Sequence, residues 1–427
     1  MQNQLYRNTA PEFKTVSSFN LLPIQKFELD NGIKVHLLEA GSQEVAKIDF
    51  LFPAGSIQAA KPLLASITSK AMIEGSEKYS AAEIAEKIDF YGAYLGQQTV
   101  FHQSVITLVS LRHFLPETLE ILEDIIKHPT FEQKEIDTIL GRRKQKFLIE
   151  SDKVKTLATR AFTQNLYGKE HPYGNYVELS DFEKITRNDI VDFHKKAYIP
   201  AGTQIIISGQ PGNNIKDLLN KHFGQLWNSN TPLSDWKPEI NKELNSEIFV
   251  PKTDTLQSAL KIGRPLFNKL HPDFHGMQIL NTILGGYFGS RLMTNIREEK
   301  GLTYGISSFI MTYKHTGFIL VSTDVKAENR ELAVKEVFNE LKRLREEPIS
   351  EDELTLVRNF LSGDMIRNFD GPFATSDNYR GLIDLDISTE YFHDFFKVLM
   401  NITAKDLQDL AQKYLKEEDF ITVIAGK

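Results

Sequence analysis

Ile185-Thr-Arg-Asn-Asp-Ile-Val-Asp-Phe-His-Lys-Lys-Ala-Tyr198, followed by Gln204-Ile-Ile-Ile-Ser-Gly209, has a counterpart near the C-terminal end of the chain. The counterpart is Ile402-Thr-Ala-Lys-Asp-Leu-Gln-Asp-Leu-Ala-Gln-Lys-Tyr414, followed by Ile421-Thr-Val-Ile-Ala-Gly426, and the two align without a gap at a separation of 217 residues. Each copy opens with Thr-x-x-Asp, a helix-start signature, and ends in a β-branched run that stops at a glycine. The chain therefore reads as a duplication of one domain.

The boundary between the two halves falls where polar and proline residues replace any periodicity, around Asn228-Ser-Asn-Thr-Pro-Leu-Ser-Asp-Trp-Lys-Pro238. We expect an N-terminal domain over residues 1–228, a linker over 229–245 and a homologous C-terminal domain over 246–427. Both domains are long enough to bury a hydrophobic core of their own.

Local patterns predict hairpins that alternate with longer helices. Asn31-Gly32 sits between two apolar runs, which predicts a tight hairpin turn with two positive-φ positions. Ile48, Phe50 and Phe52 alternate as in a half-buried strand, and Ser80-Ala-Ala-Glu83 is a capping box. Apolar stripes over 115–126 and 334–344 predict long amphipathic helices. This pattern indicates an α+β fold with one α/β sandwich layer in each half.

Composition narrows the function classes. The 427 residues carry a net charge of −7, which argues against a nucleic-acid-binding surface, and they contain no cysteine. No apolar run is long enough to cross a membrane, and the polar N-terminal residues do not resemble a secretory signal. We expect a cytoplasmic protein, or a periplasmic one if a signal peptide has been removed.

The order and spacing of several motifs resemble the pitrilysin/insulinase superfamily of zinc metallopeptidases, in its mitochondrial-processing-peptidase-like branch. The resemblance implies two homologous domains that form one half of a clamshell chamber. It covers the chain from Phe27 to Gly426 and rests on the Asn31-Gly32 hairpin, Phe52-Pro-Ala-Gly-Ser56, Glu74-Gly-Ser76, His171-Pro-Tyr-Gly174, Leu284-Gly-Gly-Tyr-Phe-Gly-Ser-Arg-Leu292 and Ile296-Arg-Glu-Glu-Lys-Gly-Leu-Thr-Tyr304.

Members of that superfamily carry His-x-x-Glu-His on a helix just before the Gly-Ser turn, where two histidines bind zinc and the glutamate activates water. In this chain the same window holds Ser66 and Lys70 at the histidine positions and Ser69 at the glutamate position. A serine hydroxyl is a poor zinc ligand, and a protonated lysine has no lone pair to offer. The family's third ligand would fall near Phe147, where the nearest carboxylate is Glu150. We therefore expect no catalytic residue and no metal in this chain.

Two other residue pairs have a spacing that could serve a different chemistry. Ser66 and Lys70 are four residues apart on one helix face, as a serine–lysine hydrolase would require, but nothing in the sequence supplies an oxyanion hole. His271 and His275 have the spacing of a helical metal pair, but Pro272 favours a helix start there instead.

The second half keeps two residues that the resemblance marks as substrate-binding. Arg297 and Tyr304 have the family's seven-residue separation, and in the family this pair contacts the peptide near the scissile carbonyl. A guanidinium and a phenol both donate hydrogen bonds to a developing oxyanion. The alternative is an ion pair of Arg297 with a glutamate and a half-buried core tyrosine.

A chain that has lost the zinc motif and kept this pair is expected to be the non-catalytic, substrate-binding subunit of a heterodimeric zinc endopeptidase. The partner would be a chain of the same family that bears His-x-x-Glu-His and holds the zinc, and the substrate would be a peptide. A non-catalytic peptide-binding or structural scaffold, possibly a homodimer, is the alternative. A self-sufficient hydrolase is the third hypothesis.

Overall fold

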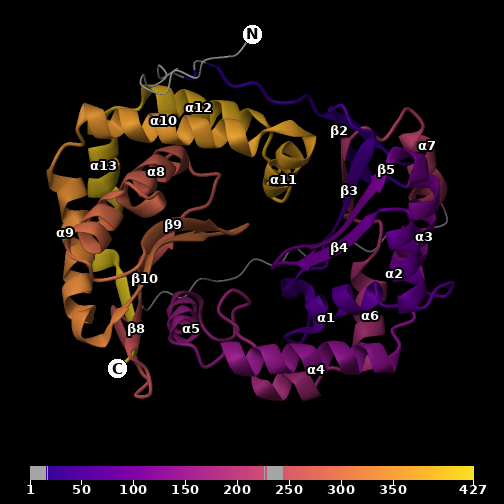
Figure 1. The fold of residues 1–427 in the computed structure, drawn as a ribbon, viewed down its shortest axis with the longest axis horizontal. Coiled ribbons are helices and arrows are strands. Elements are labelled where there is room, and N and C mark those ends of the chain that lie inside the picture. The colour runs from indigo at the N-terminus through magenta and orange to yellow at the C-terminus, as the bar shows by residue number, and fades with distance from the viewer. Residues whose placement is uncertain (1–15, 17, 226, 228–243) are drawn as a thin grey trace, which may run out of the picture.

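In the computed structural model, which describes residues 16, 18–225, 227 and 244–427, two mixed β-sheets face each other across the molecule (Figure 1). The first sheet has the order β1-β2-β6-β3-β5-β4 and the second has the order β7-β11-β8-β10-β9. The strands of the first sheet are β1 (Gln25–Glu28), β2 (Lys34–Glu39), β3 (Val45–Phe52), β4 (Tyr94–Thr99), β5 (Ser104–Leu111) and β6 (Gln204–Gly209). Those of the second are β7 (Glu247–Pro251), β8 (Gln257–Leu266), β9 (Ile306–Thr312), β10 (Gly317–Lys326) and β11 (Ile421–Gly426).

The two sheets share one topology. β2 pairs with β6 in parallel and β7 pairs with β11 in parallel, whereas every other neighbouring pair is antiparallel. The strands β6 and β11 begin 217 residues apart, as do the helices that precede them. The α+β fold with two homologous domains, predicted from the duplicated stretch, is therefore confirmed. The linker predicted over 229–245 lies almost entirely in the 228–243 stretch, outside the described residues.

Helices complete both halves. The first half contains α1 (Leu64–Met72), α2 (Ala81–Phe90), α3 (Leu115–Lys127), α4 (Gln133–Glu150), α5 (Val154–Tyr167), α6 (Arg187–Ala197) and α7 (Ile215–Leu219). The second contains α8 (Phe274–Asn281), α9 (Arg330–Glu346), α10 (Glu351–Asn368), α11 (Gly371–Ile383), α12 (Glu390–Asn401) and α13 (Ala404–Tyr414). Three π-helical segments are η4 (Asn220–Gly224), η5 (Thr282–Gly286) and η6 (Met293–Glu299).

One helix of each half packs against the β-sheet of the other half. Helix α5 belongs to the first half in sequence but packs on β8 and β11, where Phe162 is fully buried. Helix α11 belongs to the second half but packs on β2 and β6, where Tyr379 joins a small buried cluster with Ile206. Figure 1 shows α4 leading to α5 along one side of the molecule, and α10 and α12 running along the opposite side toward α11. The exchange couples the two halves by burying apolar surface of each against the other.

The exchange also explains why one strand differs from its prediction. Strand β3 was expected to be half-buried, but seven of its eight residues are buried, because α11 covers the face that would otherwise meet solvent. An ion pair fixes this contact: Lys47 Nζ on β3 lies 2.5 Å from Asp377 Oδ1 on α11 and 3.3 Å from Asp49 Oδ2.

The predicted helix starts are confirmed, and the predicted turn is partly wrong. Ser80, Thr186 and Thr403 each form a capping box with the acidic residue three positions later. In the β1–β2 hairpin, however, only Gly32 has a positive φ, at 83°. The connection is a five-residue loop, closed by a hydrogen bond from the Leu29 N–H to the Ile33 carbonyl and another from the Gly32 N–H to the Leu29 carbonyl. It therefore does not need the two left-handed positions of a tight two-residue turn.

Candidate functional site

Helix α1 carries the residues that occupy the zinc-motif window. Ser69 is buried and accepts a hydrogen bond from Ser104 Oγ at 3.0 Å, and Ser104 in turn accepts one from the Tyr198 hydroxyl at 2.9 Å. Burial raises the pKa of Tyr198 to about 12, so this chain of hydroxyls stays neutral. The position that would hold a water-activating glutamate is thus occupied by Ser69, whose hydroxyl is buried and hydrogen-bonded within the core.

Ser66 and Lys70, which stand at the two histidine positions of the zinc motif, both interact with groups of their own helix or its end. The Ser66 hydroxyl donates to the Leu63 carbonyl at 2.9 Å, and Lys70 Nζ lies 3.2 Å from Glu74 Oε1. Since the Lys70 ammonium faces a carboxylate and the Ser66 hydroxyl faces its own helix, neither activates the other. The geometry therefore gives no support to a serine–lysine hydrolase.

Ser66 and Lys70 open onto a pocket of about 790 Å³ between α1, α4 and the edge strand β4. We call it the α1–α4 pocket. It also brings in Phe147 and Glu150, the residues nearest the predicted position of a third metal ligand. The remaining lining residues are Leu63, Glu74, Gln97, Gln98, Thr99, Glu135, Thr138, Ile139, Arg142, Arg143, Lys146, Val177 and Phe182.

The residues of this pocket do not fit a zinc ion. A catalytic zinc site takes three His, Asp or Glu ligands, and no such group is found in the part of the chain that the structure describes. Glu150 accepts an ion pair from Lys153 at 2.7 Å, and Glu74 pairs with Lys70. Four cationic side chains in the same lining would repel a divalent cation.

Arg297 lies on the π-helical segment η6 in the second half. Its guanidinium carbon stacks 4.6 Å from the ring centre of Phe288, an aromatic residue in the glycine-rich loop before η6. No ion pair between Arg297 and a glutamate is found in the described residues, so the alternative of a structural Arg297–glutamate pair does not describe this side chain. A guanidinium that stacks on a ring keeps its N–H groups available for a ligand.

Tyr304 projects into solvent from a well-anchored turn. Its side chain is 95% exposed, so it is not a core tyrosine. The residue before it holds the turn in place: the Thr303 hydroxyl donates to the Asp324 carbonyl at 2.7 Å and to the Gly305 carbonyl at 3.0 Å. The backbone is fixed while the phenol is left without packing contacts, as is common for residues that bind a partner or a ligand.

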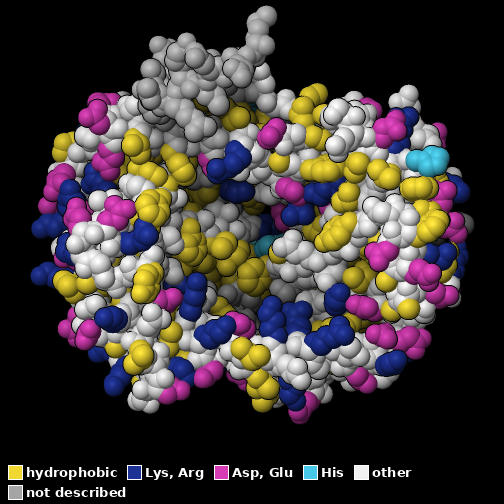
Figure 2. Space-filling model, in the orientation of Figure 1, with side chains coloured by type: hydrophobic (Ala, Val, Ile, Leu, Met, Phe, Trp, Pro, Cys, Tyr) yellow, Lys and Arg dark blue, Asp and Glu magenta, His cyan; other side chains and the backbone are white. Residues whose placement is uncertain are grey.

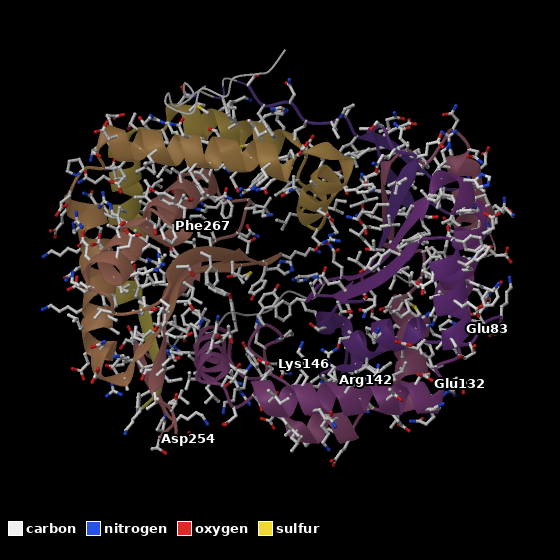
Figure 3. The ribbon with its side chains drawn as sticks, in the orientation of Figure 1. Glu83, Glu132, Arg142, Lys146, Asp254 and Phe267 are labelled. Carbon is white, nitrogen blue, oxygen red and sulfur yellow. The ribbon has the colours of Figure 1, made fainter. Side chains whose placement is uncertain are left out.

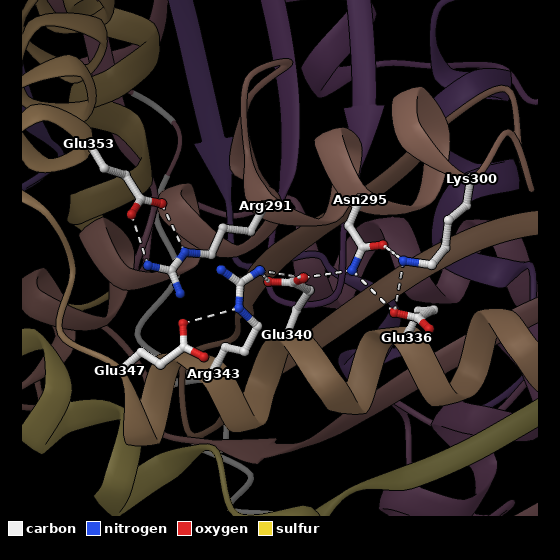
Figure 4. Close-up of polar contacts among 8 residues, drawn as sticks. All are labelled: Arg291, Asn295, Lys300, Glu336, Glu340, Arg343, Glu347 and Glu353. Atoms are coloured by element: carbon white, nitrogen blue, oxygen red, sulfur yellow. Dashed lines mark hydrogen bonds and ion pairs between the residues drawn. The ribbon is translucent and has the colours of Figure 1, made fainter.

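A polar network supports the segment that carries Arg297 (Figure 4). Arg291, just before η6, donates two hydrogen bonds to Glu353 on α10, at 2.9 and 2.8 Å. Asn295 donates to the fully buried Glu340 on α9 at 2.6 Å. Arg343 forms an ion pair with the same carboxylate, with its Nη1 3.0 Å from Glu340 Oε1. The network ties η6 to two long helices and so fixes the position of Arg297.

The sequence predicts only the apolar stripe of α9, over 334–344. In the structure, two charged side chains of the same helix also take part in the network: Glu336 pairs with Lys300 at 3.3 Å, and Arg343 pairs with Glu340. The signal in the sequence was weak, because nothing in the helical period shows that a second polar segment lies across from them.

The histidine pair of the second half has structural roles. His271 stacks on Phe267 with ring centres 3.7 Å apart, and His275 packs against Tyr391 at 4.5 Å. Helix α8 starts at Phe274, as Pro272 indicates. The two imidazoles therefore serve the packing around α8, as expected.

Sequence reasoning missed two features of the site. In the sequence Phe288 is one residue of a glycine-rich stretch, yet in the structure it is 62% exposed and its ring stacks on the Arg297 guanidinium. The cations of α4 were not singled out, although Arg142 and Lys146 have the four-residue spacing that places them on one helix face. Gly285, in the same glycine-rich stretch, allows a close backbone approach, since a Cβ there would lie 2.6 Å from the Ser308 nitrogen.

Comparison with known proteins relates both halves of the chain to one peptidase family. Residues 34–171 match the family described as insulinase (peptidase family M16), and residues 184–361 match the peptidase M16 inactive domain. The chain is 22% identical over 352 residues to an uncharacterized zinc protease, YmxG, of Bacillus subtilis, covering 80% of this chain and 84% of that protein. It is 22% identical over 258 residues to the probable inactive metalloprotease YmfF of the same organism, covering 57% of each.

A subunit of a processing enzyme is also similar. The chain is 21% identical over 392 residues to the mitochondrial-processing peptidase subunit beta of Saccharomyces cerevisiae, covering 86% of this chain and 83% of that protein. Among solved structures, a peptidase M16 inactive domain from Pseudomonas fluorescens superposes with a TM-score of 0.84 at 23% identity, covering 95% of this chain and 98% of that one. The two matched regions account for most of the chain, one in each half. This protein belongs to the insulinase (M16) peptidase family.

Proposed function

We propose that this chain is the non-catalytic, substrate-binding subunit of a heterodimeric zinc endopeptidase. A partner of the same family, bearing His-x-x-Glu-His, supplies the zinc and the general base. This chain supplies Arg297 and Tyr304, which bind the peptide substrate near the scissile carbonyl. The similarity to a subunit of the mitochondrial-processing peptidase supports the division of labour, since that protein is by name one part of an assembly.

One observation carries the proposal: the two halves of this chain differ in what they offer a substrate. The α1 window presents Ser66, Ser69 and Lys70, none of which suits zinc. The second half presents an exposed Tyr304 and a guanidinium stacked on Phe288. The hydrogen-bond donors of Arg297 and Tyr304 are accessible and their backbone is held in place, which favours substrate binding. The first half, in contrast, offers no group that would hydrolyse a peptide.

The test is reconstitution with a zinc-bearing family member from the same organism. The mixture is expected to cleave peptides that neither chain cleaves alone, and this chain purified by itself is expected to hold no stoichiometric zinc after dialysis. Arg297→Ala should lower kcat/KM by about 10- to 100-fold, because a charge-assisted hydrogen bond contributes about 1.5–3 kcal/mol. Arg367→Ala, which removes an exposed arginine of α10, is the matched control and should have little effect. Unchanged activity of Arg297→Ala would remove the mechanism.

The second candidate is a peptide-binding or structural scaffold without catalysis, possibly a homodimer. The similarity to the probable inactive metalloprotease of Bacillus subtilis favours it. This function predicts peptide binding with no cleavage in any mixture. No helix in the described part of the chain is long and apolar enough to span a membrane.

A further inference from the structure

The α1–α4 pocket contains more positive charge than its own carboxylates neutralise. It is lined by Lys70, Arg142, Arg143 and Lys146 together with three glutamates. Two of those carboxylates are already paired, Glu74 with Lys70 and Glu150 with Lys153 from outside the lining. Only Glu135 remains to balance three further cations.

The cations come from one face of α4. The α4 residues of the lining recur every three or four positions from Glu135 to Glu150, which is one stripe along the helix. Figure 3 shows Arg142 and Lys146 on the side of α4 that faces α1 and the centre of the molecule. In Figure 2, Lys and Arg side chains gather at the rim of the central hollow, over α4 and α5.

Both arginines of the pocket lack a protein partner in the described part of the chain: neither Arg142 nor Arg143 makes a hydrogen bond or an ion pair there. The Arg143 side chain is exposed, and partial desolvation by neighbouring protein atoms lowers the pKa of its guanidinium. A carboxylate bound there stabilises the charged guanidinium, because it accepts charge-assisted hydrogen bonds and offsets the partial loss of hydration.

The rest of the pocket suits a peptide rather than a bare ion. Its volume of about 790 Å³ is that of a ligand site, and Ile139, Phe147 and Val177 supply apolar wall. Gln97 and Gln98 add neutral polar groups from the edge strand β4. Their amides are able to donate to a ligand without adding charge.

We infer that the α1–α4 pocket, which Ser66 and Lys70 of the zinc-motif window help to line, is an anion site in this chain, and that it binds a carboxylate group of the peptide substrate. Arg142 and Arg143 contact the carboxylate, and Lys146 adds to the positive field. The inference rests on the proposed function in that it takes the ligand to be a peptide, and it adds a preference for acidic ones. The carboxylate has two sources, an Asp or Glu side chain or the peptide's C-terminus.

The experiment uses the full-length chain and three fluorescent peptides. The first has internal glutamates and blocked ends, the second replaces those glutamates with glutamine, and the third is the glutamine peptide with a free C-terminal carboxylate. Tighter binding of the first than the second assigns the site to acidic side chains, and tighter binding of the third than the second assigns it to the C-terminus. The preference should weaken as salt rises, since it is electrostatic.

Matched variants locate the site. Arg142→Gln/Arg143→Gln should weaken binding of the preferred carboxylate peptide at least about tenfold and leave the neutral peptide unchanged. Lys134→Gln/Lys144→Gln removes the same charge from α4 at positions outside the lining and should change both peptides by less than about twofold. Circular dichroism checks that all variants are folded.

The outcomes separate this inference from the proposed function. Equal binding of all three peptides by the unmodified chain would overturn the anion site and leave peptide binding intact. An equal loss in the control variant would assign the preference to the net charge of α4 rather than to the pocket, and would also overturn it. Binding of none of the peptides would remove both proposals.

Discussion

Phe162 provides a direct test of the exchange of helices between the two halves. It lies on α5, is fully buried, and its ring centre is 5.5 Å from that of Phe318 on β10. A Cβ on Gly263 of β8 would come within 2.9 Å of the Phe162 ring, so the strand has no side chain that could fill the space left by a truncation. Phe162→Ala should therefore lower the free energy of unfolding by about 3–5 kcal/mol.

The assay is urea unfolding followed by circular dichroism, with hydrogen exchange to locate the effect. Phe162 belongs to the first half in sequence but packs on the second sheet. The rate of amide hydrogen exchange in β8 and β11 should therefore rise more than that in β3 and β6. Phe90→Ala, at a position that is 78% exposed on α2, is the control and should cost no more than about 0.5 kcal/mol. A loss below about 1 kcal/mol for Phe162→Ala, or faster exchange confined to the first sheet, would refute the reasoning.

Two further predictions concern groups buried elsewhere. His194 Nε2 donates a hydrogen bond to the Ile126 carbonyl at 2.9 Å, and burial lowers the pKa of the imidazole to about 4 from 6.5. The unfolded chain therefore takes up a proton that the folded chain does not, so stability falls as the pH drops from about 6.5 to about 4, by about 3 kcal/mol. His194→Gln should flatten that part of the pH profile of urea unfolding, and an unchanged slope would contradict the assignment. Glu353→Gln breaks the two-bond pair with Arg291, which is only 11% exposed, and should cost about 2 kcal/mol in the same assay. A stability equal to that of the unmodified chain would show that the pair does not hold η6 in place.

The sequence predicted those parts of the fold that are coded locally. The Thr-x-x-Asp starts of α6 and α13 and the Ser80 capping box are local patterns of hydrogen bonding, so neighbouring residues suffice to define them. The hairpin turn was predicted less well because a single glycine with a positive φ also suits longer loops, and loop length is set by the pairing of the strands.

The candidate site divides in the same way. The spacing of Ser66 and Lys70 on one helix was enough to predict that they share a face, and α1 confirms it. That the cations of α4 line the same pocket could not be predicted, because α4 follows α1 by about 60 residues and packs beside it only in the folded chain.

The amino-acid sequence by itself determined that the protein is a duplicated α+β chain and which residue types stand in the zinc window, since both follow from residue identity and spacing. Only the tertiary structure decided that α5 and α11 each pack on the sheet of the other half, that Tyr304 is exposed while Arg297 stacks on Phe288, and that the α1–α4 pocket is rich in positive charge. The physical reason is that burial and electrostatic fields depend on which segments meet in space, and residues distant in sequence contribute to both.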